Sequence, residues 1–366
     1  MIVDKVHVPK NICVVVSSLG KGGAERSSAL LTKMLDMLGH RVFLVTMEDS
    51  IDYIFEGNFL NVGAWKPAND NFLFRFKRAR LLRRYLREHK IDLVIDNRAR
   101  NLFYRDVIFN KYVYKNIKKI YVIRSFKLAT YFPRKKWKAR FLYKNADALV
   151  GVSKGIVAHV KNTYGFEHVH LIYNPVENKG MTQSSDIPKP FIMTLGRLDD
   201  GVKNYRLLLD AYAETQLPAL EIPLLILGSG KDRQMIKEKI ASLKLEKMVM
   251  MQPFDPHPER HLEQAHFVTL TSRHEGFPRA IIEALAVGTP VVSVDCDSGP
   301  SEIIKDGENG LLVPNFDKAA LVKAMNRMAQ DQQLHLKCKQ QAKNSVAHLS
   351  LENIAVFWQR LIQKVC

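Results

Sequence analysis

Short apolar runs that alternate with helical segments constrain the fold of this chain more than any other feature. The runs are rich in Val, Ile and Leu, which is typical of strands buried on both faces of a parallel sheet. Because parallel strands need crossover helices, the alternation predicts an α/β fold with helices on both sheet faces. The predicted strands are Asn11–Ser18, Arg41–Met47, Ile91–Asp96, Ile120–Ser125, Asp147–Val152 and Val169–Asn174, then Phe191–Leu195, Leu224–Leu227, Met248–Gln252, Phe267–Thr271 and Pro290–Val294.

One polar stretch, residues 175–190 (PVENKGMTQSSDIPKP), interrupts this alternation and is typical of an interdomain linker. The length of 366 residues also fits two domains better than one. We therefore predict doubly wound domains at 1–177 and 191–349, joined by a linker at 178–190. Their strands would end at a central cleft, where open α/β sheets bind ligands. Residues 350–366 are predicted to form an amphipathic helix, capped by Ser350, that packs back on the first domain.

The positive charge is confined to one half of the chain. The net charge is +18, and residues 1–180 contain 33 Lys and Arg against 15 Asp and Glu, whereas residues 181–366 are balanced. This asymmetry indicates a polyanionic partner of the first half, such as a phosphate-rich glycan, anionic lipid or nucleic acid, or else a basic surface that only aids solubility. No nucleic-acid-binding motif is present, so we expect no nucleic acid partner.

Two segments carry much of this charge, namely Asn71–Lys90 and Phe132–Lys144. In the first, Phe72, Phe76, Leu82 and Leu86 recur at helical spacing and are predicted to pack inward. In the second, Trp137 and Phe141 are interleaved with cations, a pattern typical of a helix that lies on an anionic membrane. A core helix with a solvated basic face would give the same pattern.

The cysteines and apolar runs indicate the compartment. Cys13, Cys296, Cys338 and Cys366 form no CxxC pair and no zinc-binding cluster, which is typical of reduced thiols. The start of the sequence lacks the apolar run of a signal peptide, and no apolar stretch is long enough to span a membrane. We therefore expect a cytoplasmic protein, peripheral at the inner face of the cell membrane, with no metal site and no cofactor.

The strongest motif is Ser272–Val292 (SRHEGFPRAIIEALAVGTPVV), which follows a buried strand and predicts a helix from about Pro278. The free amides near Gly276 and Phe277 would then form an anion site at the helix start, suited to a diphosphate. Glu275 and Glu283 lie about two helical turns apart near one face, where they can accept from sugar and ribose hydroxyls. Since Glu283 sits among apolar residues, a ligand or a specific partner is expected for its carboxylate.

Three further loops follow predicted strands. Thr194–Asn204 holds Arg197 and Lys203, two cations able to neutralise a leaving diphosphate without a metal. Ser17–Glu25 contains Gly20, Gly22 and Gly23 and allows a phosphate or sugar to approach the backbone closely. The turn at Gly228 either passes near a nucleotide or is a plain strand-to-helix turn.

Together, GGAE, GRL…KN, GSG and EGFPxxxxEAxAxGxPVV resemble glycosyltransferase family 4, whose members are retaining, generally metal-independent enzymes with the GT-B fold of two Rossmann-like domains. The resemblance implies that Arg197 and Lys203 grip the diphosphate of a UDP-sugar, or of a GDP-sugar, and act in catalysis with Glu275, which contacts the transferred hexose or N-acetylhexosamine. The other implied binding residues are Gly20, Gly22, Gly23 and Gly228, then Gly276, Phe277 and Pro278 at the phosphates, Glu283 at the ribose, and Gln252 and Phe254 at the base. The turn at Ser298–Glu302 resembles members that build bacterial surface or lipid-linked glycans.

The chain departs from the family at one place in the first domain. Many relatives carry a histidine that faces the sugar, but this region reads YVIRSFKLATYFPRK and has none. Arg124 stands near that place and is taken as a substrate-binding residue, with Asn97 or Arg98 at the end of the preceding strand. The alternatives to a transferase are a nucleotide-sugar epimerase on the same fold and a basic, non-enzymatic protein that binds lipid or nucleic acid.

Overall fold

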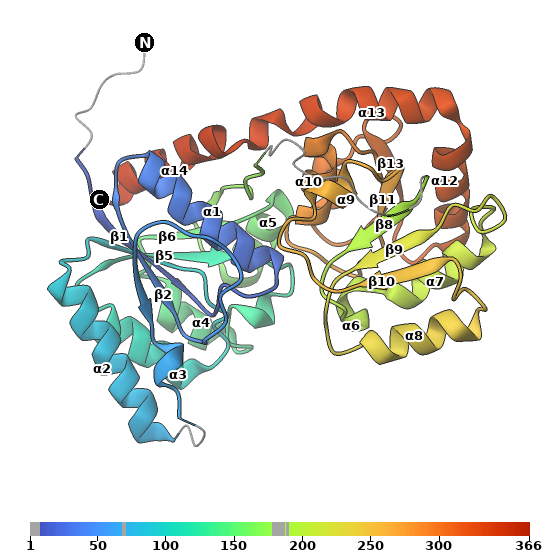
Figure 1. Cartoon of the computed structure of the whole chain (residues 1–366). Coiled ribbons are helices and arrows are strands. Elements are labelled where there is room, and N and C mark those ends of the chain that lie inside the picture. The colour runs from blue at the N-terminus through green and yellow to red at the C-terminus, as the bar shows by residue number, and fades with distance from the viewer. Residues whose placement is uncertain (1–7, 68–70, 178–186, 188–189) are drawn as a thin grey trace, which may run out of the picture.

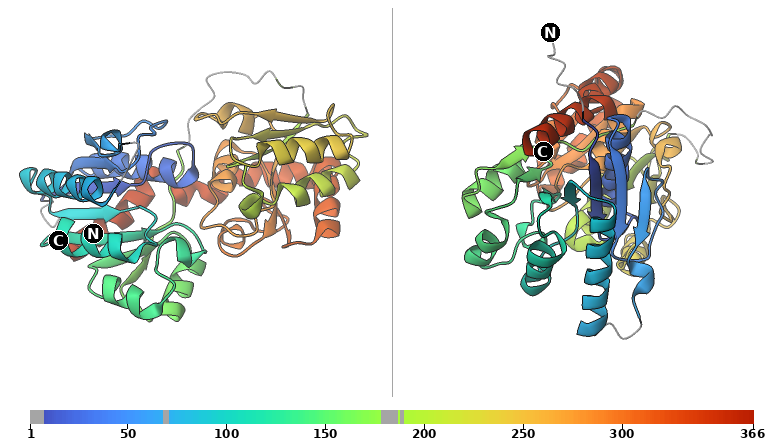
Figure 2. Two further views of the ribbon diagram at one scale, coloured as in Figure 1. Left: turned by 90° about the horizontal axis from the view of Figure 1, so that it is seen from below. Right: turned by 90° about the vertical axis from the view of Figure 1, so that its left-hand side faces the viewer.

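The computed structural model describes residues 8–67, 71–177, 187 and 190–366. These residues form two α/β domains, each built around one sheet with helices on its faces (Figures 1 and 2). This confirms the predicted fold class. The predicted linker at 178–190 lies almost entirely outside the described residues.

The sheet of the first domain has the order β3-β2-β1-β4-β5-β6-β7, with every neighbouring pair parallel. Strands β1, β2 and β4 are almost wholly buried, as their apolar sequences predict. The strands are β1 (Asn11–Val16), β2 (Arg41–Thr46), β3 (Asn58–Asn61), β4 (Leu93–Asp96), β5 (Lys118–Ile123), β6 (Ala148–Gly151) and β7 (Val169–Leu171). The helices are α1 (Gly23–Met37), α2 (Phe72–Glu88), α3 (Phe103–Ile108), α4 (Lys136–Tyr143) and α5 (Lys154–Tyr164).

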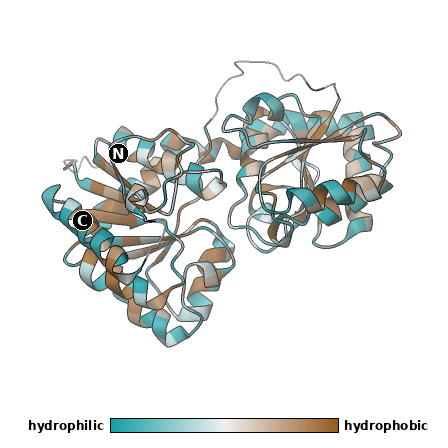
Figure 3. Cartoon of the chain, turned by 60° about the horizontal axis from the view of Figure 1, so that its bottom comes forward, coloured by the Kyte–Doolittle hydropathy of each residue, from teal (hydrophilic) through white to brown (hydrophobic). Residues whose placement is uncertain are grey.

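The sheet of the second domain is also parallel and has the order β10-β9-β8-β11-β12-β13. Its strands are β8 (Ile192–Leu195), β9 (Leu224–Leu227), β10 (Val249–Gln252), β11 (Phe267–Leu270), β12 (Val291–Asp295) and β13 (Gly310–Pro314). Its helices are α6 (Asp200–Lys203), α7 (Tyr205–Glu214), α8 (Arg233–Ser242), α9 (Glu259–Leu262), α10 (Arg279–Val287), α11 (Pro300–Ile303), α12 (Lys318–Gln330) and α13 (Gln332–Val346). Hydropathy colouring shows the strands of both sheets mostly brown at the centre and the outward helix faces teal (Figure 3).

The chain returns to the first domain through its last helix, α14 (Leu351–Val365). Ser350 caps this helix by accepting from the amide of Asn353, as predicted. Gln359 pairs with His40 of the first domain at 3.0 Å. The chain connects the domains twice, and the two connecting segments are hydrogen-bonded to each other. The amide of Val176 donates to the carbonyl of Leu349 at 2.9 Å.

A second set of contacts joins the domains through the Ser298–Glu302 turn. The Glu302 carboxylate accepts from the amides of Lys154 at 2.8 Å and Gly155 at 3.1 Å, which begin α5. The Tyr173 hydroxyl donates to the same carboxylate at 3.2 Å. A side chain of the second domain therefore caps a helix of the first.

The basic segments form α2 and α4, but their apolar residues pack differently from the prediction. Leu82 and Leu86 are buried as expected. The inward placement of Phe76 is wrong, because its ring is 41% exposed and stacks on Tyr112 at 5.6 Å between ring centroids. The side chain of Phe72 lies outside the described part of the chain. In the parts of the chain that the structure describes, no helix has both the length and the apolar character needed to cross a bilayer.

Candidate active site between the two domains

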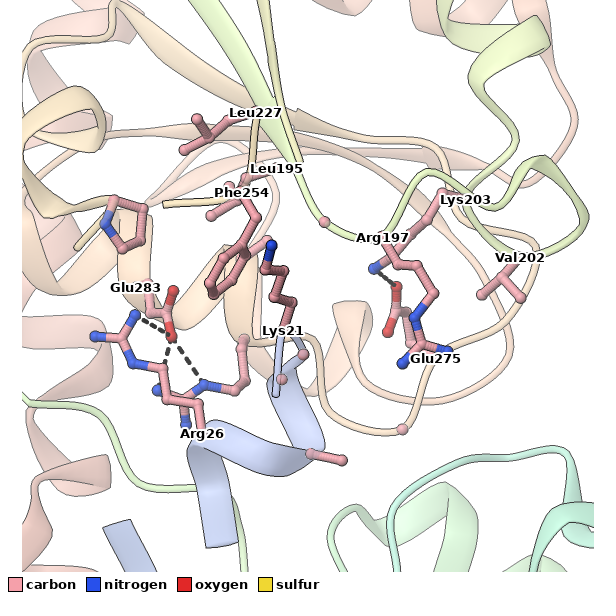
Figure 4. A pocket seen from close by; sticks show the side chains of 18 of the residues that line it. Lys21, Arg26, Leu195, Arg197, Val202, Lys203, Leu227, Phe254, Glu275 and Glu283 are labelled. Carbon is pink, nitrogen blue, oxygen red and sulfur yellow. Dashed lines mark hydrogen bonds and ion pairs between the residues drawn. The ribbon is translucent and has the colours of Figure 1, made fainter. Parts of the chain in front are cut away.

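The strands of both sheets end at a pocket between the domains, which we call the interdomain pocket (Figure 4). The first domain contributes the loop before α1, the start of α1, the loop after β2 and the ends of β5 and β7. The second domain contributes the loops after β8, β9, β10 and β11 and the first two turns of α10. The predicted site residues that line the pocket are Gly22, Gly23, Arg124, Arg197, Lys203, Phe254, Glu275, Gly276, Phe277 and Glu283.

Helix α10 begins one residue later than predicted, at Arg279, with Pro278 as its N-cap and no capping side chain. The amides of Gly276 and Phe277 donate to no other described residue. A helix start of this kind attracts an anion. Gly276 is also required by packing, because a Cβ there would lie 2.1 Å from the backbone oxygen of Arg124 in the first domain.

Lys203 and Glu275 form a pair at one end of the pocket, with 2.6 Å between Nζ and Oε1. The Ser272 hydroxyl donates to the same carboxylate at 2.7 Å. The amide of Phe126, in the first domain, donates to the backbone oxygen of Glu275 at 2.9 Å. Gly196, at φ +148°, lets the Lys203 stem pass, since a Cβ there would lie 3.0 Å from Lys203 Cε. The Glu275 carboxylate is therefore held by its own domain while its backbone is tied to the other.

Arg197 lies beside this pair and is largely exposed (Figure 4). Its guanidinium makes no hydrogen bond or ion pair with any other residue in the described ranges. A Cβ on Gly22 would lie 3.5 Å from Arg197 Nη2, so the glycine loop of the first domain faces this cation. Gly22 is also the N-cap of α1 and offers no capping side chain. Two helix starts, those of α1 and α10, therefore flank two cations, an arrangement suited to a diphosphate.

Glu283 lies at the other end of the pocket and is paired with two guanidinium groups (Figure 4). Its Oε1 is 2.7 Å from Arg279 Nη2 and 3.4 Å from Arg26 Nη1. Arg26 also pairs with Glu259. Burial lowers the pKa of Arg279, whereas for Arg26 the attraction of Glu283 and Glu259 outweighs burial and raises the pKa. The partner expected for the Glu283 carboxylate is thus present in the protein, and its Oε2 is not engaged by either guanidinium.

Arg124 lines the pocket, is half-buried, and points toward two amide side chains. It donates to Asn174 Oδ1 at 2.6 Å and to Asn97 Oδ1 at 3.3 Å. Burial lowers the pKa of Arg124 to about 10, so it is cationic at neutral pH. Arg98 instead pairs with Asp96 at 2.6 Å within the first domain. Asn97 is therefore the residue at the end of β4 that contacts Arg124, and Arg98 is not.

Four predicted site residues do not line the pocket but shape its walls. A Cβ on Gly228 would lie 2.0 Å from the oxygen of Gly196, so this glycine lets two loops touch. Gln252 accepts from the Gly228 amide at 3.0 Å. Pro278 is the N-cap of α10. A Cβ on Gly20 would lie 2.4 Å from Ser50 Oγ, so Gly20 admits the loop after β2.

The pocket also contains residues that were not predicted from the sequence. Arg279 lies within the strongest motif and Arg26 follows the glycine loop, so adjacency to a motif is the only signal for either. Tyr53 and Asn174 carried no signal. The pocket also includes Lys21, Ala24, Leu195, Asp199, Val202, Leu227, Ser229, Asp255, Pro258 and Ala280.

Comparisons with known proteins define the class of the enzyme. The family description Glycosyl transferases group 1 matches residues 181–345, and Glycosyltransferase Family 4 matches residues 21–179. The chain is 30% identical over 348 residues to the N-acetylgalactosamine-N,N'-diacetylbacillosaminyl-diphospho-undecaprenol 4-alpha-N-acetylgalactosaminyltransferase of Campylobacter jejuni, covering 90% of this chain and 93% of that relative. It is 29% identical over 268 residues to the lipopolysaccharide 1,6-galactosyltransferase of Escherichia coli, covering 70% of each.

Solved structures agree on the fold. The structure of Anabaena HepE in complex with UDP and glucose is similar to this chain with a TM-score of 0.78 at 19% identity, covering 97% of this chain and 99% of that one. The chain therefore belongs to the family 4 glycosyltransferases with the GT-B fold. It is a transferase rather than an epimerase or a non-enzymatic binding protein.

Proposed function

We propose that this enzyme transfers a hexose or N-acetylhexosamine from a UDP-sugar to a lipid-linked or cell-surface glycan, with retention of configuration and without a metal ion. The observation that carries the proposal is the set of Arg197, Lys203 and Glu275 beside two helix starts. Cations at that place stabilise a diphosphate as it leaves, which is the charge that develops in the transition state.

This arrangement supports a reaction in which the diphosphate leaves and the acceptor enters on the same face of the sugar. The bond from the anomeric carbon to the diphosphate oxygen breaks, and its electron pair stays on the diphosphate, where Arg197 and Lys203 neutralise it. The acceptor hydroxyl attacks the anomeric carbon from the face the diphosphate leaves, which keeps the configuration. Its proton passes to the departing diphosphate. Glu275, held by Lys203 and Ser272, accepts hydrogen bonds from hydroxyls of the transferred sugar.

The choice of donor and acceptor is supported by similar proteins. The HepE structure holds UDP and glucose, and a structure of Staphylococcus aureus TarM, similar with a TM-score of 0.76, holds UDP and alpha-GlcNAc-glycerol. The Campylobacter relative is named for a diphospho-undecaprenol substrate and the Escherichia coli relative for lipopolysaccharide. A UDP-sugar and a polyprenyl-diphosphate glycan are therefore the first substrates to test.

Exposed aromatic and basic side chains of the first domain support a location at an anionic membrane. Trp137 and Phe141 on α4 are 60% and 48% exposed. Lys138 Nζ lies 5.5 Å from the Trp137 ring centre and Lys111 Nζ lies 5.5 Å from that of Phe141. Aromatic rings with adjacent cations are suited to the boundary between headgroups and acyl chains.

The function is tested by incubating the protein with UDP- and GDP-sugars and a polyprenyl-diphosphate glycan, followed by NMR of the new glycosidic bond. The expected product has the anomeric configuration of the donor, and EDTA leaves the rate unchanged. An inverted linkage would contradict retention, and donor turnover to a free epimer without acceptor would contradict the transferase.

Membrane binding is tested by co-sedimentation with phosphatidylglycerol vesicles. Binding should fall as salt rises, because the screening length shrinks from about 10 Å at 0.1 M to about 3 Å at 1 M. Phe141→Ser should weaken binding, whereas Phe357→Ser, on α14 with the same 48% exposure, should not. Equal binding to neutral vesicles, or equal loss in both variants, would contradict this location.

A further inference from the structure

Tyr53, on the first domain, lies against the end of the interdomain pocket that contains Phe254 and Glu283. The Tyr53 and Phe254 rings meet edge to face, with 6.0 Å between centroids and an interplanar angle of 89°. Lys21 Nζ, also from the first domain, lies 5.9 Å from the Phe254 ring centre. Phe254 follows β10 in the second domain, so this aromatic contact bridges the two domains.

The loop that carries Tyr53 is fixed by backbone contacts with the glycine loop. The amide of Leu19 donates to the Ser50 oxygen at 2.9 Å, and the amide of Asp52 donates to the Leu19 oxygen at 2.9 Å. Gly20 makes this approach possible, because a Cβ there would lie 2.4 Å from Ser50 Oγ. Tyr53 is therefore held in place by a firmly attached loop.

Charged groups of both signs surround Tyr53, and they have opposing effects on its pKa. Burial and the negative charge of Glu283 raise the pKa of Tyr53 to about 12, against the opposing effect of Arg26 and Arg279. The phenol is therefore neutral at physiological pH and keeps its proton as a donor. Arg26, which also belongs to the first domain, lies 3.4 Å from the Glu283 carboxylate.

The two ends of the pocket differ in the chemistry that they offer. The end with Arg197, Lys203 and Glu275 offers an ion pair and a guanidinium that is unpaired among the described residues, whereas at the other end the Phe254 ring lies near Glu283 and its guanidinium partner Arg26 (Figure 4). Tyr53 adds a second aromatic ring there, edge to face with Phe254. A nucleoside diphosphate has the same division, because its diphosphate is anionic while its nucleoside has a planar base and two ribose hydroxyls. An aromatic ring that stacks on a base contributes affinity for any base, since every base has a π face.

We propose that Tyr53 packs on the nucleoside of the donor, so that the first domain contributes to binding of the nucleoside as well as of the diphosphate. The inference rests on the proposed nucleotide-sugar donor and extends it to a residue outside the motifs of the second domain. Because Tyr53 and Phe254 belong to different domains, nucleoside binding then favours the arrangement in which the domains meet.

Isothermal titration calorimetry with UDP and with inorganic pyrophosphate tests this inference. Tyr53→Ala should raise the Kd for UDP by about tenfold or more, the usual contribution of one base–aromatic contact. It should leave the Kd for pyrophosphate unchanged, because pyrophosphate lacks the nucleoside. Tyr53→Phe should bind UDP within about twofold of wild type if the ring carries the effect. Tyr104→Ala, which removes a 79% exposed ring on α3, is the matched control.

The outcomes separate this inference from the proposed function. Equal UDP affinity in wild type and Tyr53→Ala, with UDP bound by both, would overturn the role of Tyr53 alone. An equal loss of UDP and pyrophosphate affinity would also overturn it, because that pattern indicates a general disturbance of the pocket. Wild-type protein that binds neither UDP nor GDP would overturn the donor assignment, and the role of Tyr53 with it.

Discussion

Replacing Lys203 by Ala removes the cation that lies 2.6 Å from the Glu275 carboxylate in the interdomain pocket. A unit charge about 4 Å from a phosphoryl charge contributes about 4 kcal/mol at an effective dielectric constant of about 20. Loss of one pre-organised charge-stabilising group typically lowers kcat by about 10²–10³-fold. We expect a fall in kcat of this size, with a smaller change in the donor KM, since the diphosphate gains most of its charge as the sugar bond breaks.

The same substitution has a modest effect on stability. Lys203 and Glu275 are 18% and 13% exposed, so the carboxylate keeps some contact with water and still accepts from Ser272. Loss of the pair should cost about 1 kcal/mol, which lowers Tm by about 2–4 °C for a domain of this size. A loss of activity much larger than this loss of stability is the signature of a role in the reaction.

The assay measures UDP release in the presence of acceptor, with melting curves of each variant in parallel. Lys231→Ala is the control, because Lys231 Nζ lies 3.4 Å from Asp199 but is 70% exposed and does not line the pocket. It should retain wild-type kcat. A kcat for Lys203→Ala within threefold of wild type would refute the argument that this cation stabilises the leaving diphosphate.

Three further predictions follow from the structure. Gly276→Ala should lower stability by about 1–3 kcal/mol and reduce kcat, because its Cβ would lie 2.1 Å from the Arg124 backbone oxygen; unchanged Tm and kcat would contradict the contact. Burial and the nearby His335 lower the pKa of His266 to about 4. As the pH falls, His266 is therefore protonated in the unfolded chain at a higher pH than in the folded protein. Tm should therefore fall as pH drops from about 6.5 toward 4, and His266→Gln should flatten that slope; equal slopes would refute it. Arg197→Ala should weaken pyrophosphate binding by about tenfold in calorimetry at low salt, and undiminished binding would show that the guanidinium faces away from the anion.

The buried strands could be predicted from the sequence because they are continuous apolar runs, and every predicted run has a strand in the structure. Strands β3 and β13 were missed. Strand β3 lies at a sheet edge and has the half-polar sequence NFLN with partly exposed residues, so it buries too little apolar surface to leave a pattern. The same reason does not apply to β13, whose sequence GLLVP is apolar and mostly buried. Phe76 shows the limit of helical spacing as a signal, since its position in the sequence predicts an inward side chain while its ring packs on Tyr112 at the surface.

Some residues of the candidate site could likewise be predicted from the sequence, and others could not. Glu275, Lys203 and Arg197 follow strand ends, and parallel topology brings strand ends together, so their proximity could be predicted. The pairing of Glu283 with Arg26 could not, because it depends on how closely the two domains approach. Tyr53 depends on a loop packing against Gly20, a tertiary contact that leaves no periodic signal in the sequence.

The contact between Glu302 and helix α5 links the position of the domains to the state of one helix. The first amides of any helix lack partners within it, and those of Lys154 and Gly155 obtain theirs from across the domain boundary. If the domains part to release product, these two amides lose that protection and exchange with solvent. The rate of deuterium uptake at these two amides therefore reports how often the two domains separate.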